Sequence, residues 1–199
     1  MLAFPPRHSA SLVRHPAAPE SAARGIEARV YWTDGGALAF TYVLKGDLSR
    51  LRIPPPRQPR RAGRLWQHTC FEAFIAMKGE PGYYEFNFAP SGKWAVYAFR
   101  RYREAAPPVE EDMAPRITVR SAGDALELDA MFPLNHLPMI EPRALLRLAL
   151  AAVIEDDGGE LSHWALKHPP GKPDFHRSDG FARELEYPAM TLRIDTERK

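Results

Sequence analysis

Residues 65–77 read LWQHTCFEAFIAM and residues 83–99 read YYEFNFAPSGKWAVYAF, and these two stretches decide the fold. They hold three consecutive strand-like runs, separated by a turn that contains Gly and Pro and by the turn Pro90–Lys93. Aromatic and polar residues alternate along the runs, and a period of two is typical of β-strands. Gly and Pro favour tight turns between strands. The pattern predicts a β-meander at the centre of an antiparallel sheet.

Polar side chains share one face of this meander, because residues spaced by two point to the same side of a sheet. Neither face of residues 65–77 is freely polar, so we expect this run to be a central strand covered on both sides. A covered face that carries polar groups is the best candidate for the floor of a ligand site. Its predicted members are Trp66, His68, Glu72, Glu85 and Asn87.

Short strands are also predicted on both sides of the meander, and no long helix is. No linker or internal repeat divides the chain, so residues 1–199 are expected to form a single all-β domain, an antiparallel β-sandwich of about a dozen strands. By periodicity alone residues 145–154 fit either a buried strand or a helix, and their flanks, Pro142 before and Glu155–Gly159 after, favour a hairpin-connected strand. The further predicted strands are 11–14, which we place at a sheet edge, 25–32, 37–45, 116–120, 125–132, 161–166, 181–186 and 190–194.

Composition limits the function classes. The chain has a net charge of +2, one cysteine and 20 prolines in 199 residues. A nearly balanced charge favours no nucleic-acid partner, and a single cysteine excludes an internal disulfide and suits a reducing compartment. There is no apolar stretch of signal-peptide type and no run of about 20 apolar residues. We therefore expect a cytoplasmic protein without a membrane partner.

The segment Arg50–Arg64 holds six arginines and no acidic residue. It is interpreted as a solvated loop whose charges keep a sheet edge soluble. A basic lip for an anionic ligand is the alternative.

A second candidate region is His163–Phe181, which is rich in histidine. Its histidine spacing matches no zinc signature, so no metal site is assigned. Calcium bound by Asp174, Asp179 and loop carbonyls is an open alternative. A polar ligand-binding loop and a purely structural loop are weighed equally. Its candidate ligand-binding residues are Trp164, Lys167, His168, His176 and Asp179.

Two carboxylates, Glu72 and Glu85, lie on neighbouring predicted strands. Such a pair can serve glycoside hydrolysis, but cross-strand partners with a structural or binding role are more common. No nucleophile elbow, phosphate-binding loop or dinucleotide-binding motif occurs. No catalytic residue is therefore assigned.

Three strings, LWQHTCFEAFIA, GYYEFNFAPSGKWAVYAFRRYR and LSHWALKHPPGKPDFHRSDGF, resemble a bacterial group of DOMON-like domain proteins, which are related in fold to family-nine carbohydrate-binding modules. The resemblance implies a β-sandwich and makes residues 145–154 a strand. Such domains bind haem or sugars. For haem, Met131 with His163 or His68 is formally available, and for a sugar an aromatic clamp could come from Trp66, Trp94 and Trp164.

The first hypothesis is therefore a non-catalytic binding module for a carbohydrate or a similar small polar ligand. A hydrolase that uses Glu72 with His68 or His176 is the alternative, and a haem-binding domain is a third possibility. No cofactor is assigned, although haem or calcium stays open. A flat sandwich face could also support a homodimer.

Overall fold

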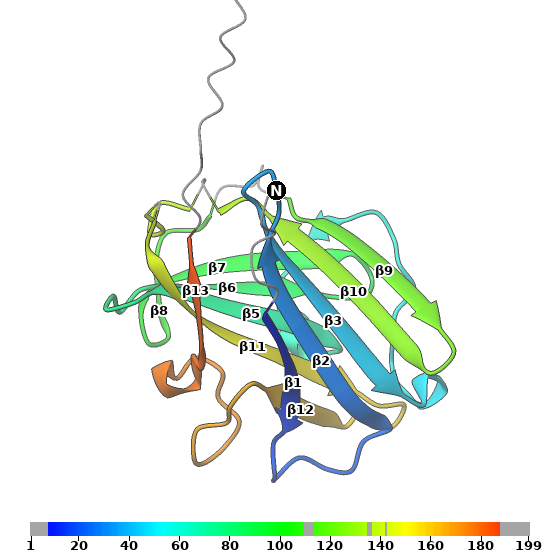
Figure 1. Cartoon of the computed structure of the whole chain (residues 1–199). Coiled ribbons are helices and arrows are strands. Elements are labelled where there is room, and N and C mark those ends of the chain that lie inside the picture. The colour runs from blue at the N-terminus through cyan, green and yellow to red at the C-terminus, as the bar shows by residue number, and fades with distance from the viewer. Residues whose placement is uncertain (1–7, 110–113, 135–136, 142, 188–199) are drawn as a thin grey trace, which may run out of the picture.

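Strands make up most of the architecture of the computed structural model (Figure 1), which describes residues 8–109, 114–134, 137–141 and 143–187. The only helical elements named in this part of the chain are three-residue 3-10 turns, η1 (Leu48–Arg50), η2 (Leu65–Gln67) and η4 (Ser178–Gly180). None of its helices could cross a membrane. The strands are β1 (His8–Arg14), β2 (Ala23–Trp32), β3 (Leu38–Gly46), β4 (Arg60–Arg61), β5 (Cys70–Met77), β6 (Tyr83–Phe88), β7 (Lys93–Arg101), β8 (Glu104–Ala105), β9 (Arg116–Ala122), β10 (Ala125–Phe132), β11 (Leu145–Glu155), β12 (Leu161–Ala165) and β13 (Arg183–Glu186).

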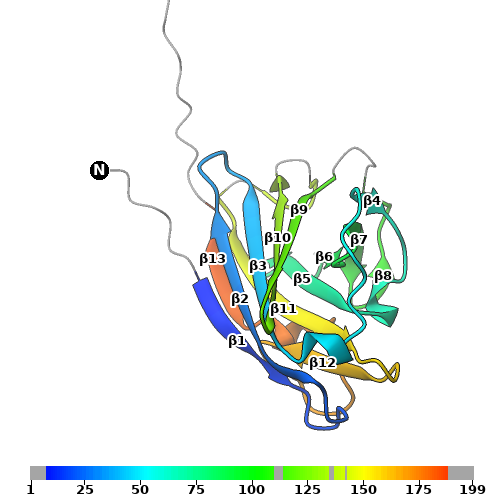
Figure 2. The same ribbon diagram turned by 90° about the vertical axis from the view of Figure 1, so that its right-hand side faces the viewer.

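The strands form a curled sheet in the order β4-β7-β6-β5-β11-β12-β1-β2-β3-β10-β9. We call β1-β2-β3-β10-β9 sheet A, and the remaining strands, with β8 beside β7 and β13 beside β11, sheet B. The two sheets lie face to face (Figure 2). The expected antiparallel sandwich is therefore confirmed, with β4 and β7 as a parallel pair.

Strand β1 joins the two sheets. Its residues 8–12 pair with β2, whereas Val13 and Arg14 pair with β12. A strand at residues 11–14 is confirmed, but its predicted place at a sheet edge is wrong, because β1 pairs with both β2 and β12. Hydrogen bonding on both sides lets this strand close one side of the sandwich.

The core lies between the sheets and contains the inward residues of both. Strand β5 contributes Phe71, Ala73 and Ile75, as the alternation predicts. In β11 the inward residues belong to this core, whereas Ala149 and Ala151 are buried on the opposite side of sheet B. Burial on both faces explains the continuous apolar run of β11, which the structure shows to be a strand.

The predicted strand at residues 65–77 is too long at its N-terminal end. Arg64 has a left-handed backbone, with φ of 58°, and the backbone N–H of His68 donates to the carbonyl of Leu65 at 3.0 Å. The paired strand β5 starts only at Cys70. The period of two therefore does not reach Trp66 and His68. The predicted strand 181–186 likewise begins later, at Arg183, and the predicted strand 190–194 lies outside the described residues.

The arginine-rich segment 50–64 runs along the edge of sheet B. Arg60 and Arg61 pair with β7, and Arg61 donates to the carbonyl of Val109 at 3.0 Å. Its guanidinium carbon also lies 5.7 Å from the centroid of the Trp94 ring. This part of the segment is held against the sheet edge, which agrees with the interpretation as an edge-covering loop.

Candidate functional site

The floor of the site is the outer face of sheet B. Glu72 on β5 lies directly opposite Asn87 on β6, and Glu85 lies opposite Phe74. Because their neighbours Phe71 and Ala73 point into the core, Glu72 and Phe74 point away from it. The two glutamates are nevertheless only 3% and 5% exposed. Another part of the chain must therefore cover the outer face of sheet B.

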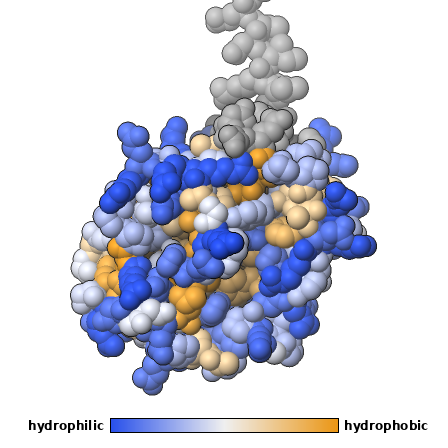
Figure 3. Space-filling model, turned by 180° about the vertical axis from the view of Figure 1, so that it is seen from behind, coloured by the Kyte–Doolittle hydropathy of each residue, from blue (hydrophilic) through white to orange (hydrophobic). Residues whose placement is uncertain are grey.

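The cover is the segment 166–182, which crosses the outer face of sheet B between β12 and β13. Its Phe181 packs with Phe74 and Tyr83 in an apolar cluster, against which Phe175 also packs. The ring of His176 lies 5.3 Å from that of Phe74, centroid to centroid. Figure 3 views the molecule from the side of sheet B, opposite to the view of Figure 1, and shows apolar patches among hydrophilic residues on this surface. Aromatic packing therefore holds the segment on the sheet.

A cavity of about 370 Å³ remains between the sheet and this segment. We call it the Glu72 pocket. Its volume lies at the small end of the range for ligand sites, roughly 300–1,000 Å³. Its polar walls are Glu72, Glu85, Arg103, His163, Asp174 and His176.

Aromatic rings form much of the remaining wall of the Glu72 pocket. Trp66 is 41% exposed and stands at the rim, with its ring centroid 5.8 Å from that of Tyr97. A half-exposed tryptophan beside buried polar groups is typical of ligand sites, because it offers a flat apolar surface. The aromatic members are Trp66, Tyr97, Phe99 and Phe175.

Hydrogen bonds fix one of the two carboxylates. The Asn87 side-chain amide donates to Oε1 of Glu85 at 2.6 Å, and the Cys70 thiol donates to Oδ1 of Asn87 at 3.3 Å. Oε1 of Glu72, by contrast, is buried and has no hydrogen-bond partner. A buried acceptor without a partner costs about 1–3 kcal/mol of stability, so Glu72 is the less stably buried carboxylate of the pair.

A second chain of hydrogen bonds orients His176. The backbone N–H of Arg103 donates to the Tyr83 hydroxyl at 3.1 Å, and the hydroxyl oxygen lies 2.8 Å from Nδ1 of His176. We assign the hydroxyl proton to the bond with Nδ1, because the hydroxyl still has its own proton to donate. In the neutral imidazole the proton is then on Nε2, which lies 3.6 Å from Oε2 of Glu85. The ring presents an N–H group to the carboxylate side of the pocket.

Burial shifts the acid–base behaviour of the pocket. It raises the pKa of Glu72 well above its usual range, and the nearby charge of Glu85 raises it further. Burial also raises the pKa of Glu85, against the opposing effects of Asn87 and Arg103. The pKa of His176 is lowered to about 4, first by burial and then by Arg103. The pocket therefore favours neutral histidine and a carboxyl group that keeps its proton.

The predicted ligand residues divide among several places. Four of them line the Glu72 pocket, namely Trp66, Glu72, Glu85 and His176. A fifth, Asn87, donates a hydrogen bond from its side-chain amide to Glu85. These residues come from the meander and from the histidine-rich segment, so the two candidate regions do meet.

Trp164 and His168 do not line the Glu72 pocket. Trp164 is buried in the core between the sheets, where its indole N–H donates to Ser162 at 3.0 Å. The placement of Trp164 in a ligand loop is therefore wrong, because it lies on the inward face of β12. Nε2 of His168 donates to the carbonyl of Val13 at 2.8 Å and ties the segment 166–182 to β1.

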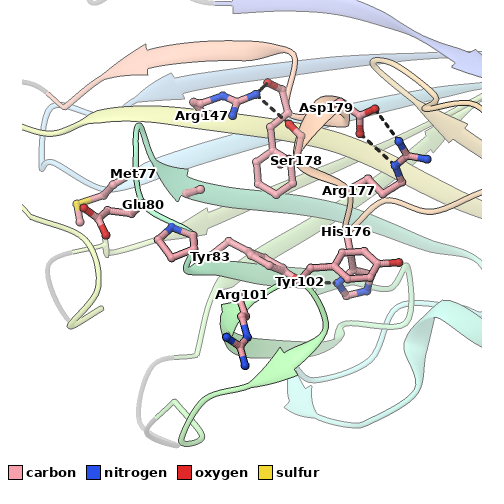
Figure 4. A pocket seen from close by; sticks show the side chains of 13 residues that line it. Met77, Glu80, Tyr83, Arg101, Tyr102, Arg147, His176, Arg177, Ser178 and Asp179 are labelled. Atoms are coloured by element: carbon pink, nitrogen blue, oxygen red, sulfur yellow. Dashed lines mark hydrogen bonds and ion pairs between the residues drawn. The ribbon is translucent and has the colours of Figure 1, made fainter.

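Lys167 and Asp179 also lie away from the Glu72 pocket. Lys167 is exposed. Asp179 pairs with Arg177 at 3.0 Å in an adjoining cavity of about 620 Å³, which Figure 4 shows. We call it the Arg147 cavity. Tyr83 and His176 form part of its wall, and Arg147 donates across it to the carbonyl of Ser178 at 2.9 Å.

His68 was expected beside Glu72, and this placement is wrong. Nδ1 of His68 instead lies 2.7 Å from Oε2 of Glu155, whose Oε1 accepts from Arg52 at 2.8 Å. These residues line a separate cavity of about 380 Å³ at the end of sheet B. The physical reason is η2, which turns the chain before β5 begins. A hydrolytic pair of Glu72 and His68 is thereby excluded.

Tyr97, Phe99 and Phe175 are pocket residues that the sequence interpretation missed. The signal for the first two was present, since residues 97 and 99 alternate with the core residues of β7 and face the same side as Tyr83 and Glu85. Arg103 and Phe175 come from loops. No periodicity could have placed them.

No group of three His, Cys, Asp or Glu side chains in the described ranges could hold a metal ion. Asp174 pairs with Arg103 at 2.9 Å and Asp179 with Arg177, so the two aspartates proposed for calcium line different cavities. Met131 lies on the outer face of sheet A, opposite to His163. These two cannot be the axial ligands of one haem.

No protein-family model matches the sequence, and no curated protein matches it. Two solved structures share its fold. One is a Bacteroides uniformis protein provisionally described as carbohydrate-binding, with 16% identity, a TM-score of 0.66, and coverage of 92% of this chain and 87% of that chain. The other is a family-nine carbohydrate-binding module from Caldicellulosiruptor kristjanssonii in complex with glucose, with 8% identity, a TM-score of 0.56, and coverage of 92% and 88%. The resemblance to DOMON-like proteins stays a prediction.

Proposed function

We propose that the chain is a non-catalytic carbohydrate-binding module and that the sugar occupies the Glu72 pocket. The observation that carries the proposal is the composition of the pocket, where aromatic rings stand beside hydrogen-bonded polar groups. A sugar offers C–H faces that stack on aromatic rings and hydroxyl groups that need fixed partners. Its fold, shared with a glucose-bound module, adds support.

Each surface of the sugar finds a suitable counterpart. Trp66 provides a flat ring at the rim, and the polar groups lie deeper, on the strands. Oε1 of Glu72 can accept a hydroxyl hydrogen bond, and Nε2–H of His176 can donate one. Because Glu85 is held by Asn87 and His176 by Tyr83, little side-chain entropy is lost on binding.

Calorimetric titration with a panel of monosaccharides, disaccharides and sugar nucleotides tests the proposal. We expect saturable binding that weakens about tenfold in Trp66→Ala, because the stacked ring is lost. Tyr31→Ala is the matched control, since it removes an aromatic ring from the outer face of sheet A. Silence across the panel at millimolar ligand, or equal effects of the two variants, would contradict the proposal.

A hydrolase is the second candidate, because Glu72 and His176 share the Glu72 pocket. A carboxyl group that keeps its proton can act as a general acid. We expect no turnover of aryl glycosides by the wild-type chain. Turnover that is lost in Glu72→Gln would favour the hydrolase instead. The cytoplasmic location, the absence of a nucleic-acid partner and the homodimer stay predictions.

A further inference from the structure

The charges that line the Glu72 pocket do not balance. Its walls carry three carboxylates, Glu72, Glu85 and Asp174, but only one guanidinium, that of Arg103. Arg103 is already paired, since its Nη2 lies 2.9 Å from Oδ1 of Asp174. With both glutamates ionised, the lining has an excess of two negative charges. A buried charge is stable only when it is paired and hydrogen-bonded.

The two histidines of the pocket do not supply the missing positive charge. Burial lowers the pKa of His163, and the nearby His15 and His168 lower it further. The pKa of His176 is also lowered, and its Nδ1 accepts from Tyr83. Both rings are therefore neutral near pH 7, and the excess of negative charge stays.

Glu72 has the strongest need for a partner. It is 3% exposed, and its Oε1 has no hydrogen bond within the described part of the chain. An unpaired buried carboxylate avoids its desolvation cost by keeping a proton. A ligand that brings a positive charge removes this cost without the proton.

The aromatic walls favour the same kind of group. Trp66, Tyr97 and Phe175 line the cavity together with the two glutamates. Aromatic ring faces attract cations, most strongly when the cation is removed from water. Rings beside unpaired carboxylates form a suitable environment for an ammonium group. A neutral hydroxyl brings no positive charge, so Glu72 would have to keep its proton.

We propose that the sugar bound in the Glu72 pocket carries a free protonated amine, as a hexosamine does, and that Glu72 and Glu85 bind this ammonium group. The inference rests on the proposed carbohydrate function and specifies the class of sugar. When the ammonium group binds, the proton of the Glu72 carboxyl leaves for the solvent. Only this O–H bond breaks, and the charge is conserved.

The experiment compares glucosamine, N-acetylglucosamine and glucose by calorimetry near pH 7. Glucose has nearly the size of glucosamine and no charge, so it separates charge from size, and the N-acetyl sugar keeps the nitrogen without its charge. We expect glucosamine to bind at least about tenfold more tightly than either neutral sugar. Titration in two buffers of different ionisation enthalpy should also show that the free amine releases up to one proton.

Glu72→Gln is the test variant, because it keeps the size of the side chain and removes the charge. We expect it to lose both the preference for glucosamine and the proton release. Glu27→Gln is the matched control, since Glu27 pairs with Lys45 on the outer face of sheet A. Thermal unfolding of both variants verifies that they fold.

The outcomes separate this inference from the proposed function. If neutral sugars bind as well as glucosamine, the amine inference is wrong and the carbohydrate function stands. Methylammonium serves as a non-sugar probe. If it binds in a Glu72-dependent way and no sugar does, the cation site is supported and the carbohydrate function is wrong. If neither sugars nor methylammonium bind, both are overturned.

Discussion

The outer faces of the two sheets use carboxylates in opposite ways. On sheet A, Glu127 and Asp129 are part-exposed, and both pair with Arg120. On sheet B, Glu72 and Glu85 are buried, and the one basic side chain within ion-pair distance of them in the described chain is His176, which lies 3.6 Å from Glu85 and is neutral near pH 7. The residue types and their period of two are alike on the two faces. Their surroundings differ.

The difference comes from the segment 166–182, which covers sheet B, whereas Arg120, Glu127 and Asp129 on sheet A stay part-exposed in the described structure. The exposed guanidinium of Arg120 compensates the charges on sheet A, and such exposed pairs contribute little to stability. Below the segment, Glu72 and Glu85 are buried, and a buried polar side chain needs a specific partner. Unpaired carboxylates therefore indicate function only where the surface is covered.

The largest expected effect follows from removing the anchor of the cover. Phe74 is fully buried, with the ring centroids of Tyr83, Phe175 and Phe181 within 6.4 Å. Phe74→Ala should lower the free energy of unfolding by about 3–5 kcal/mol and abolish sugar binding, because a cavity replaces the ring. Chemical denaturation measures the first effect and calorimetry the second.

The control on sheet A is Thr41→Ala, which removes one hydrogen bond of 2.6 Å to Asp129. We expect a loss of about 1 kcal/mol and unchanged binding. Equal losses of stability for Phe74→Ala and Thr41→Ala would show that the segment 166–182 is not anchored as described.

A smaller effect concerns pH. The native pKa of Glu72 is raised, so between its ordinary value of 4.5 and the native value the folded state holds a proton that the unfolded state has lost. The stability from this group is complete below 4.5 and decreases as pH rises through the native pKa. Glu72→Gln should therefore gain stability relative to wild type, by about 2 kcal/mol near pH 8.

His176 produces the opposite slope. Its pKa is lowered from 6.5 to about 4, so its contribution is present above 6.5 and is lost as pH falls towards 4. Denaturation curves from about pH 4 to about pH 8 should show a stability maximum between the two limbs. On sheet A, Asp129→Asn should instead lower stability slightly, because Arg120 loses a partner. If Asp129→Asn gained as much stability as Glu72→Gln, the two outer faces would not differ in how they hold carboxylates.

The smallest effect comes from the two arginines. Arg103→Ala removes the ion pair with Asp174 at the pocket, and Arg120→Ala removes the pairs on sheet A. Each should cost about 1 kcal/mol or less, since both guanidinium groups are more than half exposed. Only Arg103→Ala should change sugar affinity, by a few-fold, as measured by calorimetry. If Arg103→Ala binds the sugar with the same affinity as the wild type, Arg103 does not contribute to the binding site.

Much of the fold could be predicted from the sequence, because alternation is a local property. It placed Phe71, Ala73 and Ile75 in the core and Glu72 and Glu85 on the other face. It could not reveal that Trp66 and His68 precede the strand, since a left-handed residue and a 3-10 turn leave the pattern of residue types unchanged.

The site was only partly predictable for a different reason. Whether Glu72 lies beside Asn87 depends on strand register, which residue types alone do not specify. Trp164 was assigned as a ligand residue because it belongs to the histidine-rich region, although Trp164 and His163 are neighbours on a strand and so point to opposite faces. Arg103 and Phe175 lie in loops, where residue types follow no repeating pattern from which their positions could be predicted.

Hydrogen exchange with glucosamine at millimolar concentration tests the central claim most directly, namely that the covered face of sheet B is the ligand site. Bound sugar should slow exchange at the backbone amides of residues 166–182 and around Trp66, and should leave β9 and β10 unchanged. The protection should be weaker in Glu72→Gln. Slower exchange on sheet A, or no protection anywhere in the chain, would contradict the claim.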